Sequence, residues 1–264
     1  MSLLVAHVWG QCPHTCATNR LTNFGFCGVD AKFYVHSLFI SIFEPDFLNP
    51  AGAVYLGGCN MRCSFCQNYE LIEKPRDGKT FSPEELTKYI LYLQDRSKCI
   101  EWIGGEPLLY SLQILELLRV CKQRLNVPQV ISTNLYFNPL LLEVLSGVFD
   151  LWLCDFKFWN EDCAIKIASV NPDYRFLIEM NLRLLQELNE DFLVVHLPLP
   201  SHYDCCTEPI INFCRENEYP LLLLTQYRPE YKARNNSKLG RSLGAEELSR
   251  IISKTRELSY YVIY

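Results

Sequence analysis

Short apolar runs alternate with amphipathic stretches through most of the chain. Runs five to eight residues long, nearly free of charge, occupy 51–58, 100–104, 129–133, 150–156, 192–197 and 220–225. Continuous apolar runs of this length are typical of strands that are covered on both faces, as in parallel sheets. The pattern therefore predicts six buried strands.

The stretches between these runs carry apolar residues at helical spacing. The helix expected to begin near residue 83 has the clearest start, because Ser82 supplies an N-cap, Pro83 a first-turn proline and Glu85 a capping-box acid. Further helices are expected at 109–124, 139–145, 174–188, 208–216 and 244–258.

Strands that alternate with helices indicate an α/β fold with a parallel sheet, and six such units suggest a partial (β/α)6 barrel of the TIM type. We expect residues 49–264 to form this barrel. Residues 1–48 are expected to form a small cysteine-containing N-terminal extension, with one or two extended segments at 32–47.

Polar motifs follow the expected strands at their carboxyl ends, where ligands bind in such sheets. Each motif alone is a weak signal, but together they predict one functional rim. In chain order they are a cysteine loop at 57–68, G-G-E-P at 104–107, S-T-N at 132–134, D-F-K at 155–157, His196, and T-Q-Y-R-P at 225–229.

In the cysteine loop, three residues separate Cys59 from Cys63 and two separate Cys63 from Cys66. Three thiolates so spaced can hold three irons of a cubane cluster and leave the fourth iron without a protein ligand. A structural site normally closes its coordination with four protein ligands, whereas a reactive metal keeps one position open. The alternative is three unrelated core cysteines.

A second cysteine-rich stretch precedes the first expected strand. Cys12, Cys16 and Cys27, together with His14 or His7, have the residue types of a metal site. A closed tetrahedral site needs a fourth ligand, so a metal-free, packed segment is the alternative.

Composition narrows the classes of function. The net charge of -5 argues against a broad nucleic-acid-binding surface or an anionic-membrane anchor. The sequence has no apolar run of the ~18 residues that a bilayer crossing needs. We interpret the thirteen cysteines, without a signal peptide, as thiols of a protein in the reducing cytoplasm.

The cysteine loop, G-G-E-P and D-F-K resemble the motifs of the radical S-adenosylmethionine superfamily, and of the relatives of pyruvate formate-lyase activating enzyme in particular. The N-terminal C-P-H-T-C and the late Q-Y-R-P-E-Y-K-A (226–233) resemble an activating-enzyme-like branch without an assigned substrate. The resemblance covers nearly the whole chain.

The resemblance implies a [4Fe-4S] cluster on Cys59, Cys63 and Cys66, whose open iron chelates S-adenosylmethionine. Electron transfer from the reduced cluster would give methionine and a 5′-deoxyadenosyl radical, which takes a hydrogen atom from a substrate. The cofactor carries this chemistry, and the protein positions it and excludes water. An electron donor such as flavodoxin or ferredoxin is implied as a partner.

The resemblance also implies contacts to S-adenosylmethionine. Gly104 and Gly105 would let backbone approach the methionine amino group, and Glu106 would fix that edge; a plain turn with a charged exit is the alternative. Lys157 would pair with the methionine carboxylate and Asp155 with the ribose or amino region, or the two would simply pair with each other.

The remaining residues expected to contact S-adenosylmethionine come from several separate motifs. Phe65 would lie near the adenine or merely pack, and His196 would contact the ribose or be a satisfied core histidine. Ser132, Asn134 and Gln226 complete the expected cofactor-binding set.

The chain also departs from the family pattern. It has S-T-N-L at 132–135 where activating enzymes have Asp-Thr-Asn-Gly, so the monovalent-cation site of those enzymes is not expected. Val195 stands where relatives often have arginine, and Trp9 where they have a further cysteine. No insert of eight extra cysteines follows the main loop, so electron-relay clusters are not expected.

Three functions compete at this stage. The first is radical chemistry on a protein or peptide, such as installing a glycyl radical. The second is epimerisation or dehydrogenation of a small molecule or sugar, for which Cys205, Cys206 and Cys214 are candidate hydrogen donors or ordinary filler. The third is a non-catalytic iron–sulfur or zinc module, which would need no row of polar motifs at a rim.

Overall fold

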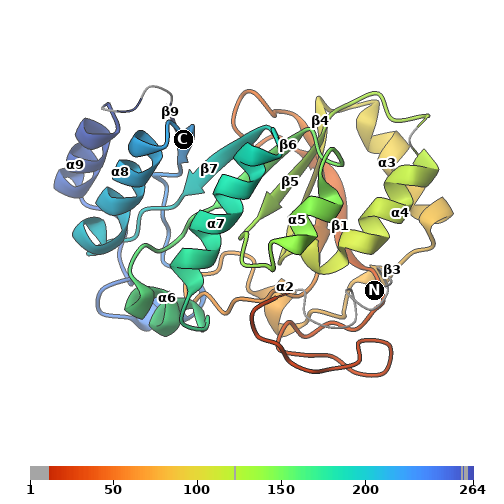
Figure 1. The fold of residues 1–264 in the computed structure, drawn as a ribbon, viewed down its shortest axis with the longest axis horizontal. Helices are drawn as coiled ribbons and strands as arrows, with labels where there is room; N and C mark the ends of the chain where they lie inside the picture. The colour runs from red at the N-terminus through yellow and green to blue at the C-terminus, as the bar shows by residue number, and fades with distance from the viewer. Residues whose placement is uncertain (1–11, 122, 257, 259–260) are drawn as a thin grey trace.

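The structure, a computed structural model, describes residues 12–121, 123–256, 258 and 261–264. Within these residues one sheet runs in the order β3-β1-β2-β4-β5-β6-β7-β8-β9 (Figure 1). Strands β2 and β4 to β9 are parallel, and β1 is antiparallel to β2 and β3. The strands are β1 (Tyr34–Ser41), β2 (Ala51–Leu56), β3 (Lys79–Thr80), β4 (Cys99–Gly104), β5 (Gln129–Thr133), β6 (Leu151–Asp155), β7 (Phe192–His196), β8 (Leu221–Leu223) and β9 (Tyr261–Ile263).

Helices connect successive parallel strands, and α3, α4, α5, α7 and α8 lie along one face of the sheet (Figure 1). No helix in the described part of the chain is long and apolar enough to cross a membrane. The helices are α2 (Glu70–Glu73), α3 (Pro83–Gln94), α4 (Ser111–Cys121), α5 (Leu140–Leu145), α6 (Glu161–Ala168), α7 (Tyr174–Glu187), α8 (Glu208–Glu216) and α9 (Ala245–Thr255), with short turns η1 (Pro107–Tyr110), η2 (Tyr203–Thr207) and η3 (Tyr231–Asn235).

The structure confirms the α/β fold and all six predicted strands, which pair in parallel from β2 to β8. The helix beginning at Pro83 has the predicted capping box between Ser82 and Glu85. Helices α2 and α6 and strands β3 and β9 were not predicted. Helix α6 has eight residues, about two turns, and the other three are shorter still, so each presents too little of its pattern to be recognised.

The sheet has two differently packed faces. The helix-covered face carries the larger core, in which Trp102 and Trp152 are fully buried. The opposite face, called the inner face here, is lined by a second apolar cluster of strand residues and Leu48. Its members are Leu48, Ala51, Cys99, Val130, Leu153, Leu193, Val195 and Leu222.

The segment before residue 48 shares both the sheet and the core with the rest of the chain. Strand β1 pairs along β2 from Val35 to Ser41, and Val29 and Phe33 belong to the larger core. Residues 12–31 lie at the same end of the sheet as α2 and α6 (Figure 1). This segment is therefore placed over the carboxyl ends of the strands.

Candidate active site

The cysteine loop leaves the end of β2 and is held by its neighbours on both sides. Cys59 and Cys63 are buried and Cys66 is half-buried. The backbone N–H groups of Arg62 and Ser64 donate to carbonyls in the last turn of α6, at 2.7 and 2.8 Å. The last carbonyls of a helix have no partner inside it, so α6 offers them to the loop.

The N-terminal segment covers the loop from the other side. The Arg62 guanidinium donates to the carbonyls of Cys59 and Phe26 and lies 4.4 Å from the centre of the Phe26 ring. The Nε2 atom of His14 is 2.8 Å from the carbonyl oxygen of Asn60. The loop is thus enclosed by segments that are far apart in the sequence.

The glycine pair after β4 lies directly against the start of the cysteine loop. A Cβ on Gly105 would lie 1.8 Å from the carbonyl oxygen of Gly58, and one on Gly104 would lie 2.4 Å from the backbone nitrogen of Leu56. Gly104 also has φ +122°, in the region that favours glycine. From the sequence, the two glycines were expected to let backbone approach S-adenosylmethionine. The structure adds that their missing side chains also make room for the backbone of residues 56 and 58.

Glu106 joins the ends of β4 and β5. Its Oε1 accepts hydrogen bonds from the Leu108 N–H (2.9 Å) and the Thr133 hydroxyl (2.8 Å), and its Oε2 accepts one from the Asn134 N–H (2.8 Å). The side chain is fully buried. Burial raises its pKa to about 7, although the three donors favour the charged form.

Asn134 connects this junction to the cysteine loop. Its Nδ2 donates to Oδ1 of Asn60 at 2.8 Å and lies 3.6 Å from Sγ of Cys59. The Nδ2 of Asn60 in turn donates to the Tyr136 carbonyl at 2.6 Å. The first, second and third predicted rim motifs are therefore in direct contact.

The three thiols of the loop suit a cluster rather than a single ion. Among the described residues, three ligand atoms within 4.8 Å of one another are found in one group, and that group does not include the loop cysteines. The loop thiols are therefore not gathered around one ion. Wider spacing is expected when each thiolate binds a different iron. Burial raises the pKa of Cys59 and Cys66 and that of Cys63 to about 12, so a bound metal would have to displace their protons.

Lys157 and Asp155 form an ion pair at the end of β6. Their side chains stay 21% and 34% exposed, so the pair lines an accessible surface. Burial alone would lower the pKa of Lys157, but Asp155 and the neighbouring Cys63 raise it above its ordinary value. The Lys157 ammonium is therefore positively charged and lies beside the cysteine loop, where the carboxylate of a ligand could compete with Asp155 for it.

His196 uses both ring nitrogens inside the protein. Its Nδ1 is 2.8 Å from the Phe156 carbonyl and its Nε2 is 3.0 Å from the Thr207 hydroxyl. The side chain is 1% exposed, and burial lowers its pKa to about 4. The satisfied core histidine that the sequence left open fits this geometry, and a ribose contact would require one of these bonds to break.

The two remaining aromatic and amide candidates differ in exposure. Phe65 is buried and makes edge contacts with the rings of Phe158 and Tyr227. Gln226 is exposed beside the buried Tyr227. Adenine and cofactor contacts for these two residues remain predictions.

The cysteines of the N-terminal stretch, Cys12, Cys16 and Cys27, differ in their contacts and exposure. The Cys27 thiol lies 3.8 Å from the Val29 carbonyl, and the Cys16 sulfur accepts from the Phe26 N–H at 3.4 Å. Cys12 is half-buried and Cys16 exposed. The alternative ligand His14 already contacts the cysteine loop, and His7 lies outside the described residues, so metal binding here remains a prediction.

Glu101 was not among the sequence candidates, yet it occupies the inner face next to Ser132. The Ser132 hydroxyl donates to Glu101 Oε1 at 2.6 Å, whereas Glu101 Oε2 is buried without a hydrogen-bond partner. Burial, reinforced by Glu44, raises the Glu101 pKa to about 7. The signal in the sequence was a single acid within the apolar run C-I-E-W-I at 99–103.

Replacing Glu101 with glutamine is expected to stabilise the protein above pH 7. The carboxyl pKa rises from 4.5 to about 7 on folding, so the folded wild type binds more protons and loses stability as pH rises between these values. The neutral variant avoids this loss, which is worth up to roughly 3 kcal/mol. Anaerobic urea unfolding at pH 5 and pH 8 measures it.

The exposed Glu116→Gln variant is the matched control and should show no pH-dependent gain. An equal stability difference for Glu101→Gln at both pH values would contradict the raised pKa.

The parallel sheet and the three-thiol loop at its carboxyl edge define an α/β protein with a candidate iron–sulfur site. The family model of the radical SAM superfamily matches residues 54–214. The chain therefore belongs to the radical SAM superfamily, whose members bind S-adenosylmethionine and a [4Fe-4S] cluster.

Two curated relatives illustrate the range of similarity. An uncharacterized protein of Methanocaldococcus jannaschii is 33% identical over 261 residues, which cover 96% of this chain and 75% of the relative. The pyruvate formate-lyase-activating enzyme of Clostridium pasteurianum is 31% identical over 113 residues, which cover 41% of this chain and 46% of that enzyme.

Solved structures share the fold at low identity. Streptococcus suis SuiB bound to S-adenosylmethionine matches with a TM-score of 0.59 and 17% identity, over 78% of this chain and 48% of SuiB, so the chain spans about half of that protein. A radical SAM methyltransferase from Sphaerobacter thermophilus matches with a TM-score of 0.62 and 16% identity, over 86% of this chain and 68% of that one.

Proposed function

We propose that the protein binds a [4Fe-4S] cluster through Cys59, Cys63 and Cys66 and S-adenosylmethionine at the open iron, and abstracts a hydrogen atom from a substrate. One observation carries the proposal. Two buried thiols and one half-buried thiol, not gathered around one ion, follow the carboxyl end of β2, and the Cys59 sulfur lies 3.6 Å from the Asn134 amide at the end of β5.

When bound, the reduced cluster supplies the electron that cleaves S-adenosylmethionine to methionine and a 5′-deoxyadenosyl radical. The protein's own residues hold the reactants. Lys157 presents a cation to the methionine carboxylate, and Asp155 keeps that cation in place. Asn134 and Glu106 fix the end of β5 against the loop. An external donor such as flavodoxin or ferredoxin reduces the cluster.

For the substrate, we favour a protein or peptide of the glycyl-radical type. The similarity to an activating enzyme over part of the chain supports this choice. The alternative is epimerisation or dehydrogenation of a small polar molecule or sugar. The inner-face carboxyl of Glu101 favours that alternative, because its unpaired Oε2 offers a hydrogen-bonding group to a small ligand.

The test is product formation by anaerobically reconstituted protein. With reductant and S-adenosylmethionine, we expect 5′-deoxyadenosine and about four irons bound at the main site. Fully loaded, reduced protein that forms no 5′-deoxyadenosine would contradict the proposal.

Isotope transfer distinguishes the substrate classes. A peptide with α-deuterated glycine should pass deuterium into 5′-deoxyadenosine if a glycyl-radical protein is the substrate. Deuterium transfer only from labelled sugars or other small molecules would support the alternative instead.

A further inference from the structure

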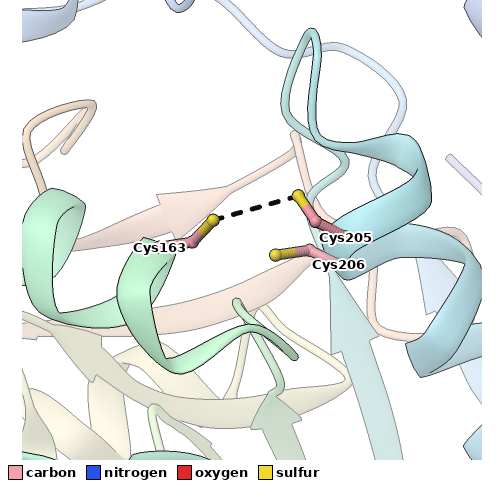
Figure 2. A group of neighbouring side chains, drawn as sticks. All are labelled: Cys163, Cys205 and Cys206. Carbon is pink, nitrogen blue, oxygen red and sulfur yellow. Dashed lines mark hydrogen bonds between the residues drawn. The ribbon is translucent and has the colours of Figure 1, made fainter.

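Three further cysteines converge away from the cluster loop. Cys163 in α6 and Cys205 and Cys206 in η2 point their sulfur atoms toward one another (Figure 2), and the three Sγ atoms lie within 4.8 Å of each other. The Sγ atoms of Cys163 and Cys205 are 3.9 Å apart. Two of these thiols are half-buried and Cys206 is buried. This group is called the rim thiols below.

The backbone around the rim thiols is fixed on both sides. The Asn160 side chain caps α6 by accepting from the Cys163 N–H at 3.0 Å. On the other side, the Cys206 N–H donates to the His202 carbonyl at 3.1 Å, which places Cys205 and Cys206 in one tight turn. The thiols are therefore brought together by ordered backbone on two elements 42 residues apart in the sequence.

The rim thiols lie at the carboxyl ends of the parallel strands, the same edge of the sheet as the cysteine loop. Helix α6 follows β6 and η2 follows β7, so both come directly after strand carboxyl ends. The carbonyls of Ile167 and Ala168 bind the cluster loop. Ile167 follows Cys163 by four positions in the helix, which is a rise of about 6 Å.

The spacing of the sulfurs fits ligands of one metal ion. With a Zn–S bond of about 2.3 Å, two ligands at tetrahedral angles lie roughly 3.8 Å apart, close to the 3.9 Å between Cys163 and Cys205. A disulfide needs about 2.05 Å, so these sulfurs would have to move together by nearly 2 Å. A disulfide would also leave the third thiol, Cys206, without a role.

We propose that the rim thiols bind a single thiophilic divalent cation such as Zn²⁺, which ties α6 to η2. Within the described part of the chain the group supplies three ligands. A zinc ion with three protein ligands keeps a fourth position for water or an external ligand. Binding replaces up to three thiol protons and transfers no electrons. The site stands on its own geometry, so it does not depend on the proposed function.

The experiment uses protein with its iron–sulfur cluster reconstituted, incubated anaerobically with Zn²⁺ and then desalted. Wild type should retain about one more zinc per chain than the Cys163→Ser/Cys205→Ser double variant. Cys214→Ala, which alters a buried cysteine of α8 outside the group, is the matched control and should retain the zinc. The set is repeated with Cys16→Ser, which removes a competing exposed thiol.

X-ray absorption at the zinc edge should show three sulfur neighbours at about 2.3 Å. Equal zinc in wild type and the double variant would overturn the proposal. So would peptide mapping that finds a Cys163–Cys205 disulfide and no zinc in the treated protein.

A second measurement covers the case in which the double variant does not fold. In wild type, Zn²⁺ at ten times its dissociation constant should slow alkylation of Cys205 about tenfold, while Mg²⁺ at the same concentration leaves the rate unchanged. An unchanged alkylation rate at Cys205 would equally overturn the site.

Discussion

Replacing Cys63 with alanine is expected to remove the iron–sulfur cluster and to reduce 5′-deoxyadenosine formation to background. The loop offers three ligands, so the loss of one leaves two for a cluster that already has an open iron. Removing a residue that only hydrogen-bonds to a metal ligand lowers metal affinity about 10- to 100-fold. Removing a ligand itself should therefore lower the affinity more than 100-fold. Iron content, cluster absorbance and 5′-deoxyadenosine yield measure the effect.

Cys99→Ala is the control for this variant. Cys99 is also buried but begins β4, at the end of the strand opposite to the cysteine loop, and its thiol lies 3.7 Å from the Leu48 carbonyl. It should keep its iron and its activity. A Cys63→Ala protein with wild-type iron and product would show that the cluster is bound elsewhere.

Much of the fold could be predicted because its pattern is local. The strand at 129–133 and the helix at 208–216 were predicted at the bounds that β5 and α8 have in the structure. Their apolar positions repeat with a clear period and end at polar residues or proline. The short α6 was missed although Asn160 is its N-cap, because eight residues give barely two turns of pattern.

The candidate site could be predicted only where its residues follow each other along the chain. The cysteine loop and the glycine pair are compact motifs, so the sequence displays them. The rim thiols and the contact between Ser132 and Glu101 join different elements, and only the sheet and its connections bring them together. Likewise, the sequence alone could not decide between the two interpretations of His196, since Thr207 and Phe156 reach its ring through the fold.

Gly105→Ala is expected to destabilise the protein by about 3 to 5 kcal/mol and to prevent stable cluster binding. The added Cβ would lie 1.8 Å from the Gly58 carbonyl oxygen, and that neighbour is backbone that cannot rotate away. Moving it would break the bond from the Glu106 N–H to the same carbonyl, 2.8 Å long. Gly58 directly precedes Cys59, so the shift would displace the first cluster ligand. Anaerobic urea unfolding and iron content measure both effects.

Gly244→Ala is the control, because its Cβ would lie 3.5 Å from the nearest atom, an oxygen of Glu247. It should cost about 1 kcal/mol or less, the value of a changed helix N-cap, and leave the iron content unchanged. The comparison separates two reasons for the glycine pair. If Gly105 served only the approach of S-adenosylmethionine, its alanine variant would keep stability and cluster and lose only cofactor binding. Loss of stability and iron in protein never exposed to S-adenosylmethionine would show instead that the pair first serves to seat the cysteine loop.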